Sequence, residues 1–199
     1  MAPRHPALIT AAVLAGGAGT RLGGRDKGLE PLGGKPLVEH VIAALHDIDA
    51  LLVVANRNHA EYARHAPTIA DAVAERHGPL AGIAAACAAC ATPWLLTLPV
   101  DCPQPPADLA GRLLQAALAG TAPAVVAHDG ATRQPLFALY RRELAESAAR
   151  AAGVGQGVWA WQDAIGVLEL DFSDRQQQFH NLNTPDDFAA HDARFRSAD

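Results

Sequence analysis

Short apolar segments alternate with amphipathic segments along most of the chain, and this alternation predicts its elements. Segments of strand length, rich in Val, Leu, Ile and Ala, lie at residues 8–14, 51–55, 68–70, 94–98, 124–127, 136–140 and 167–170. Segments with helical periodicity lie at residues 36–46, 58–64, 79–91, 106–119, 141–151 and 185–195. Residues 154–165 fit neither pattern clearly, because glycines interrupt their start. We expect Thr184 to cap the last helix, since a threonine hydroxyl accepts backbone N–H groups there.

The order of these elements predicts one α/β domain that spans residues 1–199. Strands that alternate with helices form mostly parallel sheets, and nearly continuous apolar strands are covered on both faces of such a sheet. We therefore expect a mostly parallel central sheet with helices on both faces. The length of 199 residues suits a single domain, and neither an internal repeat nor a linker divides the sequence.

Charge and composition argue against several classes of protein. The formal net charge of −5 offers no general basic surface, so we expect no nucleic-acid partner. Residues 79–100 carry no formal charge, but prolines, a glycine and threonines interrupt them, so they predict a helix and a strand and no membrane span. The 3 cysteines are too few for a disulfide framework, which favours a cytoplasmic protein.

Two of the cysteines, Cys87 and Cys90, form a C-x-x-C pair within a run of alanines. Such pairs occur in redox sites and in zinc sites, yet no second Cys or His pair with zinc spacing follows in the sequence. Free cysteine is also among the most buried residue types. We therefore interpret Cys87 and Cys90 as small apolar residues that pack in the core.

Glycines and polar residues follow the first four predicted strands. Gly16 and Gly17 follow the first strand, Asn56 the second, Asp71 the third and Asp101 the fourth. Ligands of open α/β sheets bind beyond the carboxyl ends of the strands. We therefore expect these residues to line one crevice.

The segment between residues 15 and 35 is rich in glycine and carries four cations. Glycine lets the backbone approach a phosphate closely, and cations neutralise the phosphate charge. The cations include both lysines of the chain and are Arg21, Arg25, Lys27 and Lys35. The pattern predicts a phosphate-binding loop; the alternative is a glycine-rich turn that only shapes the backbone.

Two common phosphate-binding motifs do not fit this segment. A Walker loop needs Ser or Thr after its Gly-Lys pair, and Pro36 follows Gly34-Lys35. In a dinucleotide fingerprint that starts at Gly17, Leu22 stands where Gly or Ala is required. The segment is therefore expected to serve another triphosphate chemistry.

Asp101 follows the apolar strand at residues 94–98 within the sequence Pro-Val-Asp-Cys-Pro. A carboxylate at the end of a strand is well placed to hold Mg²⁺, which favours one or two carboxylates together with phosphate oxygens and water. The alternative is an aspartate that caps or turns the chain before the next helix. With a phosphate-binding loop nearby, we expect Asp101 to bind Mg²⁺.

Several sequence motifs together resemble one family of nucleotidyltransferases. The segment LAGGAGTRLGGRDKGL at residues 14–29 is similar to the opening of molybdenum cofactor guanylyltransferases. The resemblance continues through ANRN at residues 55–58, GPLAGI at 78–83, QPLFALY at 134–140 and NLNTPDDF at 181–188. Their order and spacing extend the resemblance over almost the whole chain.

This resemblance implies a fold, an activity and partners. The fold is a Rossmann-like nucleotidyltransferase fold with a mostly parallel sheet. The activity is transfer of GMP from GTP to the phosphate of the molybdopterin (molybdenum) cofactor, with release of pyrophosphate and Mg²⁺ as the metal. The substrate phosphate is the nucleophile, so catalysis depends on positioning and electrostatic stabilisation. Transient contacts with cofactor-insertion proteins are also implied.

The resemblance further implies a nucleotide site built from backbone groups, charges and small residues. Its members are Leu14, Ala15, Gly16, Gly17, Lys27, Asn56, Asp71, Gly78, Gly82 and Asp101. The loop residues contact the nucleotide through the backbone, while Asn56 and Asp71 hold the base or ribose. Gly78 and Gly82 allow close packing beside the nucleotide.

Three catalytic residues and two cofactor-side residues are also implied. Arg21 and Lys27 neutralise the triphosphate, and Asp101 holds the metal. Asn181 and Asn183 lie near the reacting phosphates or the pterin. For Asn183 the alternative is a purely structural role as a cap of the last helix.

Three other functions compete with this interpretation. Molybdenum cofactor cytidylyltransferases have a loop of the same general form, and so do sugar-phosphate nucleotidyltransferases. In the latter a Pro-Lys pair usually stands where this chain has Asp26-Lys27. A non-catalytic nucleotide-binding adaptor is the third alternative, and the presence of both Lys27 and Asp101 argues against it.

Overall fold

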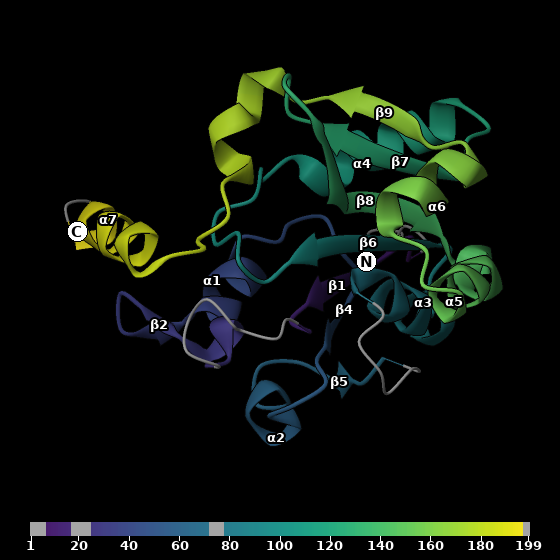
Figure 1. Cartoon of the computed structure of the whole chain (residues 1–199). Coiled ribbons are helices and arrows are strands. Elements are labelled where there is room, and N and C mark those ends of the chain that lie inside the picture. The colour runs from purple at the N-terminus through teal and green to yellow at the C-terminus, as the bar shows by residue number, and fades with distance from the viewer. Residues whose placement is uncertain (1–6, 17–24, 72–77, 197–199) are drawn as a thin grey trace, which may run out of the picture.

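The fold is a seven-stranded sheet between two layers of helices (Figure 1). A computed structural model describes residues 7–16, 25–71 and 78–196. The strand order is β5-β4-β1-β6-β8-β7-β9. The strands are β1 (Ile9–Leu14), β4 (Ala50–Val54), β5 (Thr68–Ile69), β6 (Trp94–Pro99), β7 (Ala124–His128), β8 (Arg133–Arg141) and β9 (Leu168–Asp171).

Four of the six strand pairs in this sheet are parallel, as the sequence predicts. The parallel pairs are β1 with β4, β1 with β6, β4 with β5, and β7 with β9. Only β8 runs against its neighbours β6 and β7. The expectation of a mostly parallel sheet is therefore confirmed.

Helices cover both faces of the sheet, also as expected. Along β1, Ala11 and Val13 point into one apolar cluster and Ala12 and Leu14 into the other, because neighbouring strand residues face opposite ways. The first cluster includes α1 (Leu37–Ala43) and α4 (Leu109–Ala119). The second includes α3 (Pro79–Ala89), α5 (Ala145–Gly153) and α6 (Val158–Ile165). The ambiguous segment of the sequence thus becomes the helix α6.

Several short elements lie outside this core. A two-stranded hairpin pairs β2 (Pro31–Leu32) with β3 (Lys35–Pro36), and α2 (His59–Tyr62) follows β4. The described residues also include the short 3-10 helices η2 (Lys27–Leu29), η3 (Arg142–Leu144) and η4 (Ser173–Phe179). The last helix, α7 (Pro185–Arg196), stands apart from the sheet at the left of Figure 1.

A capping box begins α7. The Asp187 amide donates to the Thr184 hydroxyl over 3.2 Å, and the Asp187 carboxylate accepts the Thr184 amide over 2.8 Å. Hydrogen bonds from the Asn183 and Thr184 amides hold the pKa of Asp187 below its usual range. The expected cap at Thr184 is therefore confirmed.

Within the described parts of the chain, no helix combines the length and the apolar character that crossing a membrane requires.

We predict that Leu96→Ala lowers the free energy of unfolding by about 2–5 kcal/mol, because Leu96 is fully buried in the central strand β6 and its loss leaves a cavity. The matched control is Leu118→Ala on α4, whose side chain is 63% exposed and whose loss changes stability by about 0.5 kcal/mol at most. Urea unfolding of both variants measures the difference. Equal losses would show that Leu96 does not lie in the core.

Candidate active site

The carboxyl ends of four parallel strands meet at one edge of the sheet. Hydrogen bonds continue beyond the strand ends, from Ala15 N–H to Val54 C=O over 2.8 Å and from Val100 N–H to Leu14 C=O over 3.1 Å. A Cβ atom placed on Gly16 would lie 3.7 Å from the Asn56 side-chain nitrogen. The structure therefore brings the first and second strand ends together, as the sequence predicts.

These backbone bonds restrict how the loop can contact a ligand. The Ala15 N–H group is already donated to β4, so the group that Ala15 offers to a ligand is its carbonyl. Gly17 and Arg21, two of the expected phosphate contacts, lie outside the described residues. Of the other expected cations, Arg25 pairs with Glu30, and Lys35 is exposed on the hairpin.

Asn56 and Asp71 hold each other in a fixed orientation. The Asn56 side-chain amide donates to the Asp71 carboxylate over 2.6 Å, and the Asp71 backbone amide donates back to the Asn56 side-chain oxygen over 3.1 Å. Both residues lie at the open edge, at the ends of β4 and β5. The pair thus presents a carboxylate whose orientation is set before any ligand arrives.

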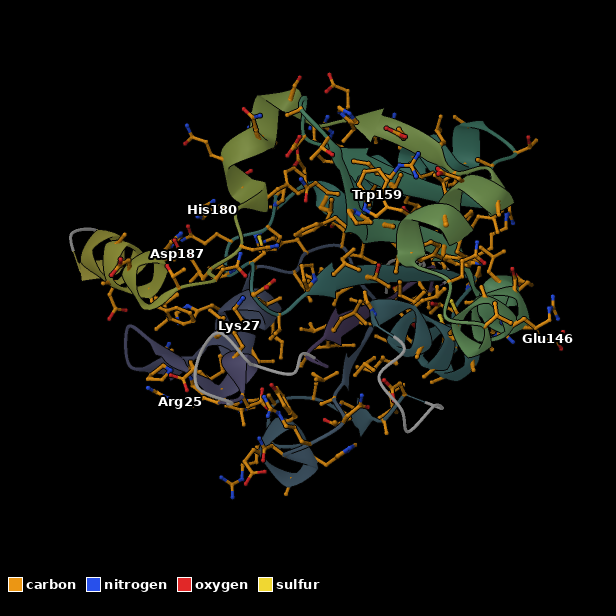
Figure 2. All side chains as sticks on the ribbon, in the orientation of Figure 1. Arg25, Lys27, Glu146, Trp159, His180 and Asp187 are labelled. Carbon is orange, nitrogen blue, oxygen red and sulfur yellow. The ribbon has the colours of Figure 1, made fainter. Side chains whose placement is uncertain are left out.

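Lys27 joins three distant parts of the chain. Its Nζ donates to Asp101 Oδ2 and to Asn183 Oδ1, each over 2.8 Å. The Leu182 amide also donates to the Asp101 carbonyl over 2.8 Å, which fixes the C-terminal segment beside the end of β6. Figure 2 shows Lys27 on the same side of the molecule as His180 and Asp187 of that segment.

Asp101 has an acceptor that the described residues do not use. Its Oδ1 is buried and has no hydrogen-bond partner in the described part of the chain, while Oδ2 accepts from Lys27. A buried carboxylate oxygen without a donor fits a hard cation. The described residues contain no group of three or more Asp, Glu, His or Cys side chains that could hold a metal. A cation at Asp101 therefore needs most of its ligands from phosphate and water, which is typical of Mg²⁺.

Asn181 and Asn183 are both close to this centre. Thr184 and Asp187 supply the cap of α7, and the Asn183 side chain is turned towards Lys27 instead. Asn181 Oδ1 is buried and has no partner among the described residues. The contacts of Asn183 thus extend beyond those of a helix cap.

The structure favours glycine at positions 78 and 82 for two different reasons. Gly78 precedes α3 with φ of 69°, a conformation that favours glycine. A Cβ on Gly82 would lie 3.3 Å from Val54 and 3.6 Å from Leu14, so glycine lets α3 pack closely on the ends of β4 and β1. That contact places α3 directly behind the loop and the Asn56 segment.

A cavity of about 430 Å³ is lined by Cys102, which follows Asp101 in the chain, and by residues of the C-terminal segment. It is bounded by the chain that follows β6, by the end of η4 and by α7, with both apolar and polar side chains in its wall. The lining residues are Cys102, Pro103, Gln104, Gln177, Gln178, His180, Asp187, Ala190 and His191. Sequence reasoning did not single out these glutamines and histidines, because only the fold brings residues 102–104 beside residues 177–191.

The fold is that of a nucleotidyltransferase, and comparisons with known proteins narrow the class. Residues 11–167 match the family described as the MobA-like NTP transferase domain. The chain is similar to the molybdenum cofactor guanylyltransferase of Cupriavidus taiwanensis, with 40% identity over 194 residues, 94% of this chain and 97% of the relative. It is also similar to the Vibrio cholerae protein of the same name, with 39% identity over 187 residues, which cover 93% of this chain and 92% of the relative. The chain belongs to the molybdenum cofactor guanylyltransferase family.

Solved structures agree on the fold. Molybdopterin-guanine dinucleotide biosynthesis protein A from Archaeoglobus fulgidus superposes with a TM-score of 0.79, at 24% identity and with 94% of this chain and 99% of that chain covered. The 2-C-methyl-D-erythritol 4-phosphate cytidylyltransferase of Thermus thermophilus gives a TM-score of 0.66, at 18% identity and with 93% and 98% covered. At these identities the likeness shows a shared nucleotidyltransferase fold.

The cysteines are buried free thiols, and Cys102 alone lines the cavity. Cys87 and Cys90 pack in α3 and at its end with 2% and 4% of their surface exposed, which confirms their interpretation as core residues. Burial raises the pKa of Cys87 to about 12, and burial beside the Asp101 charge raises that of Cys102 to about 12.

We predict that Cys87 and Cys102 resist thiol reagents in the folded protein. In a Cys90→Ala variant, labelling should stay slow as the pH rises through about 8.5, the pKa of an unfolded thiol, because the folded thiolates form only near pH 12. The same protein in urea should label rapidly, and it serves as the control. Fast labelling of the folded variant near pH 8 would contradict the buried placement.

Proposed function

We propose that this protein transfers GMP from GTP to the terminal phosphate of the molybdopterin cofactor. The cofactor phosphate oxygen forms a bond to the α-phosphorus, the bond from that phosphorus to the β-phosphate bridging oxygen breaks, and pyrophosphate leaves. The observation that carries this proposal is the placement of Lys27 between Asp101 and Asn183 at the carboxyl edge of the sheet. Membership of the guanylyltransferase family supports the choice of GTP and of the cofactor.

The guanine base lies at the ends of β4 and β5 in this proposal. The Watson–Crick edge of guanine carries two neighbouring donors, N1–H and the N2 amino group, which require acceptors. The Asp71 carboxylate, fixed by Asn56, and the Ala15 carbonyl are acceptors at the same edge of the sheet. Leu14 and Gly16 complete this part of the site, and Gly82 lets α3 close it from behind.

The triphosphate then runs from the base towards the end of β6. Lys27 neutralises its charge there, with Arg21 and the Gly17 backbone as further contacts. Lys27 Nζ has three protons, so it can bind a phosphate oxygen while it keeps a bond to Asp101 or Asn183. The fixed ammonium thereby stabilises charge that develops as pyrophosphate leaves.

Asp101 holds Mg²⁺ in this proposal through the carboxylate oxygen that has no donor. When bound, Mg²⁺ offsets charge on the α-phosphate and on the leaving group. Asp101 fixes the position of the cation, and the hydrogen bond from Lys27 orients the carboxylate.

The cofactor enters from the side opposite the base. The cavity of about 430 Å³ is lined by Cys102, which follows Asp101 in the chain, and falls within the range of about 300–1,000 Å³ that is usual for small-molecule sites. Asn181 and Asn183 lie in the chain between His180 and Asp187, two residues that line this cavity, and Asn183 accepts a hydrogen bond from Lys27. We therefore expect both asparagines to contact the cofactor phosphate. The amide and imidazole side chains of Gln104, Gln178 and His180 offer the donors and acceptors that a pterin requires.

We further propose that residues 1–199 act as a single domain. The two apolar clusters on either face of the sheet contain residues of elements from β1 to β9, so neither half of the chain has a core of its own.

We also propose that the product is passed on through transient contacts with cofactor-insertion proteins.

We predict that Asp101→Asn reduces turnover by about 10²–10³-fold with GTP, Mg²⁺ and molybdopterin, because the variant loses the charge that holds the cation. Its melting temperature should stay close to that of the parent protein, since the shape of the side chain is kept. The matched control is Glu146→Gln on α5, whose side chain is 88% exposed, pairs with Arg150 and lies at the other end of the molecule from Lys27 in Figure 2. Normal turnover of Asp101→Asn would contradict the proposal.

A further inference from the structure

Asp26 is a buried anchor directly beside Lys27. Its side chain is 6% exposed and accepts several hydrogen bonds, the first from the backbone amide of Gly28 over 3.3 Å. Asp26 precedes Lys27 as the first residue before the 3-10 helix η2, and its carboxylate binds the amide of Gly28, which follows Lys27. The turn is therefore held on both sides of Lys27. The position of the Lys27 backbone therefore depends on what holds the Asp26 carboxylate.

Two side chains from the segment after β4 hold that carboxylate. The Tyr62 hydroxyl donates to Asp26 Oδ1 over 2.5 Å, and the Asn58 amide donates to Asp26 Oδ2 over 2.9 Å. Arg57 adds an ion pair to Oδ2 at 3.4 Å and donates to the Arg25 carbonyl over 2.9 Å. Residues 57–62 thus form a cradle beneath Lys27, and we call it the Asp26 cradle.

Tyr62 is suited to this task by its burial. The residue is fully buried in the apolar cluster that α1 and α4 cover, with its hydroxyl directed at Asp26. Burial, together with the hydrogen bond to Asp26, raises the pKa of Tyr62 well above its usual value, so the hydroxyl remains a donor at any physiological pH. Asn58 adopts φ of 53°, a left-handed conformation that turns its amide towards the carboxylate.

Gly28 shows how closely the turn and the cradle approach. A Cβ atom on Gly28 would overlap the Tyr62 hydroxyl and would lie 2.9 Å from Val100 Cγ2. Each residue of the Asp26-Lys27-Gly28 sequence therefore has a physical reason. Asp26 binds the Tyr62 hydroxyl, Lys27 supplies the charge, and Gly28 has no side chain that would block the contact between Asp26 and Tyr62.

We propose that Tyr62 and Asn58 are positioning residues for Lys27, acting through Asp26. The inference rests on the proposed function, in which Lys27 binds the GTP triphosphate. Because Asn58 lies two residues after Asn56, the same short segment orients the proposed base contact and the phosphate contact. The Asp26 cradle thereby sets the distance between the two ends of the nucleotide site.

The test compares removal of the Tyr62 hydroxyl with removal of the other tyrosine hydroxyl. Tyr62→Phe and Tyr140→Phe are matched, because Tyr140 is also fully buried and its hydroxyl is bonded to Gln162, away from the loop. Both variants should lose comparable thermal stability. We expect kcat/KM for GTP, assayed with Mg²⁺ and molybdopterin, to fall about tenfold in Tyr62→Phe and to stay within about twofold in Tyr140→Phe.

Asn58→Gly provides a second variant in case Tyr62→Phe does not fold. Glycine accepts the left-handed backbone, so only the amide donor is lost. Its control is Asp47→Gly, since Asp47 has φ of 56° and is the other non-glycine residue with positive φ in the described chain. We expect Asn58→Gly to resemble Tyr62→Phe, and Asp47→Gly to resemble the parent protein.

A double-mutant cycle with Lys27→Ala separates positioning from general structure. If Tyr62 acts through Lys27, Tyr62→Phe should change kcat/KM by no more than about twofold once Lys27 is alanine. A full, additive loss in the Lys27→Ala background would overturn the inference, and so would equal effects of the two tyrosine variants. Parent-like kinetics of Lys27→Ala itself would instead overturn the proposed function of Lys27.

Discussion

The ion pair between Lys27 and Asp101 is the contact on which the geometry of the site depends. Lys27 lies in the glycine-rich segment after β1, Asp101 follows β6, and Asn183, which accepts the second Lys27 bond, precedes α7. The pair therefore forms only when β6 lies beside β1 and the C-terminal segment returns to the same edge. The Leu182 bond to the Asp101 carbonyl secures that return.

In the proposed function, this arrangement lets an acidic protein bind a polyanion. The formal net charge of −5 repels phosphate, so attraction has to be local. Lys27 is only 19% exposed and is held by a carboxylate and an amide, which keep its ammonium at a fixed point. A divalent cation bound to Asp101 Oδ1 would make the net charge at Asp101 positive. The triphosphate would then meet positive charge both at this cation and at Lys27.

The strand ends of the site could be predicted from the sequence, because apolar strands and the polar residues after them are local signals. Gly16, Asn56, Asp71 and Asp101 needed only the rule that parallel strands share an edge. The hairpin of β2 and β3 was missed, although Gly33-Gly34, both at positive φ, is a local signal for a two-residue turn. The sequence does not show the contact of this hairpin with α7, where the Gly33 amide donates to Asp192 over 2.6 Å. Such contacts between distant residues leave no local pattern.

The Asp26 cradle was missed for a similar reason. Tyr62 has the pattern of an ordinary buried aromatic residue, and only the fold shows that its hydroxyl reaches Asp26. The antiparallel direction of β8 was also not predicted, although residues 129–132 between β7 and β8 are too few for the crossover that a parallel pair requires. The resemblance to guanylyltransferases identified the Asp26-Lys27-Gly28 motif without its physical basis, which the hydrogen bonds of Asp26 and the space at Gly28 supply.

Calorimetric binding of GTP, CTP, ATP and UTP, each with and without Mg²⁺, tests the central claim most directly. We predict that only GTP binds tightly and that Mg²⁺ strengthens its binding, because in the proposed site Asp71 and the Ala15 carbonyl accept from guanine and Asp101 holds the cation. Selective binding of CTP would point to a cytidylyltransferase and contradict the proposed base contacts. Absence of binding by any nucleotide, even with Mg²⁺, would contradict the assignment of this edge of the sheet as the active site.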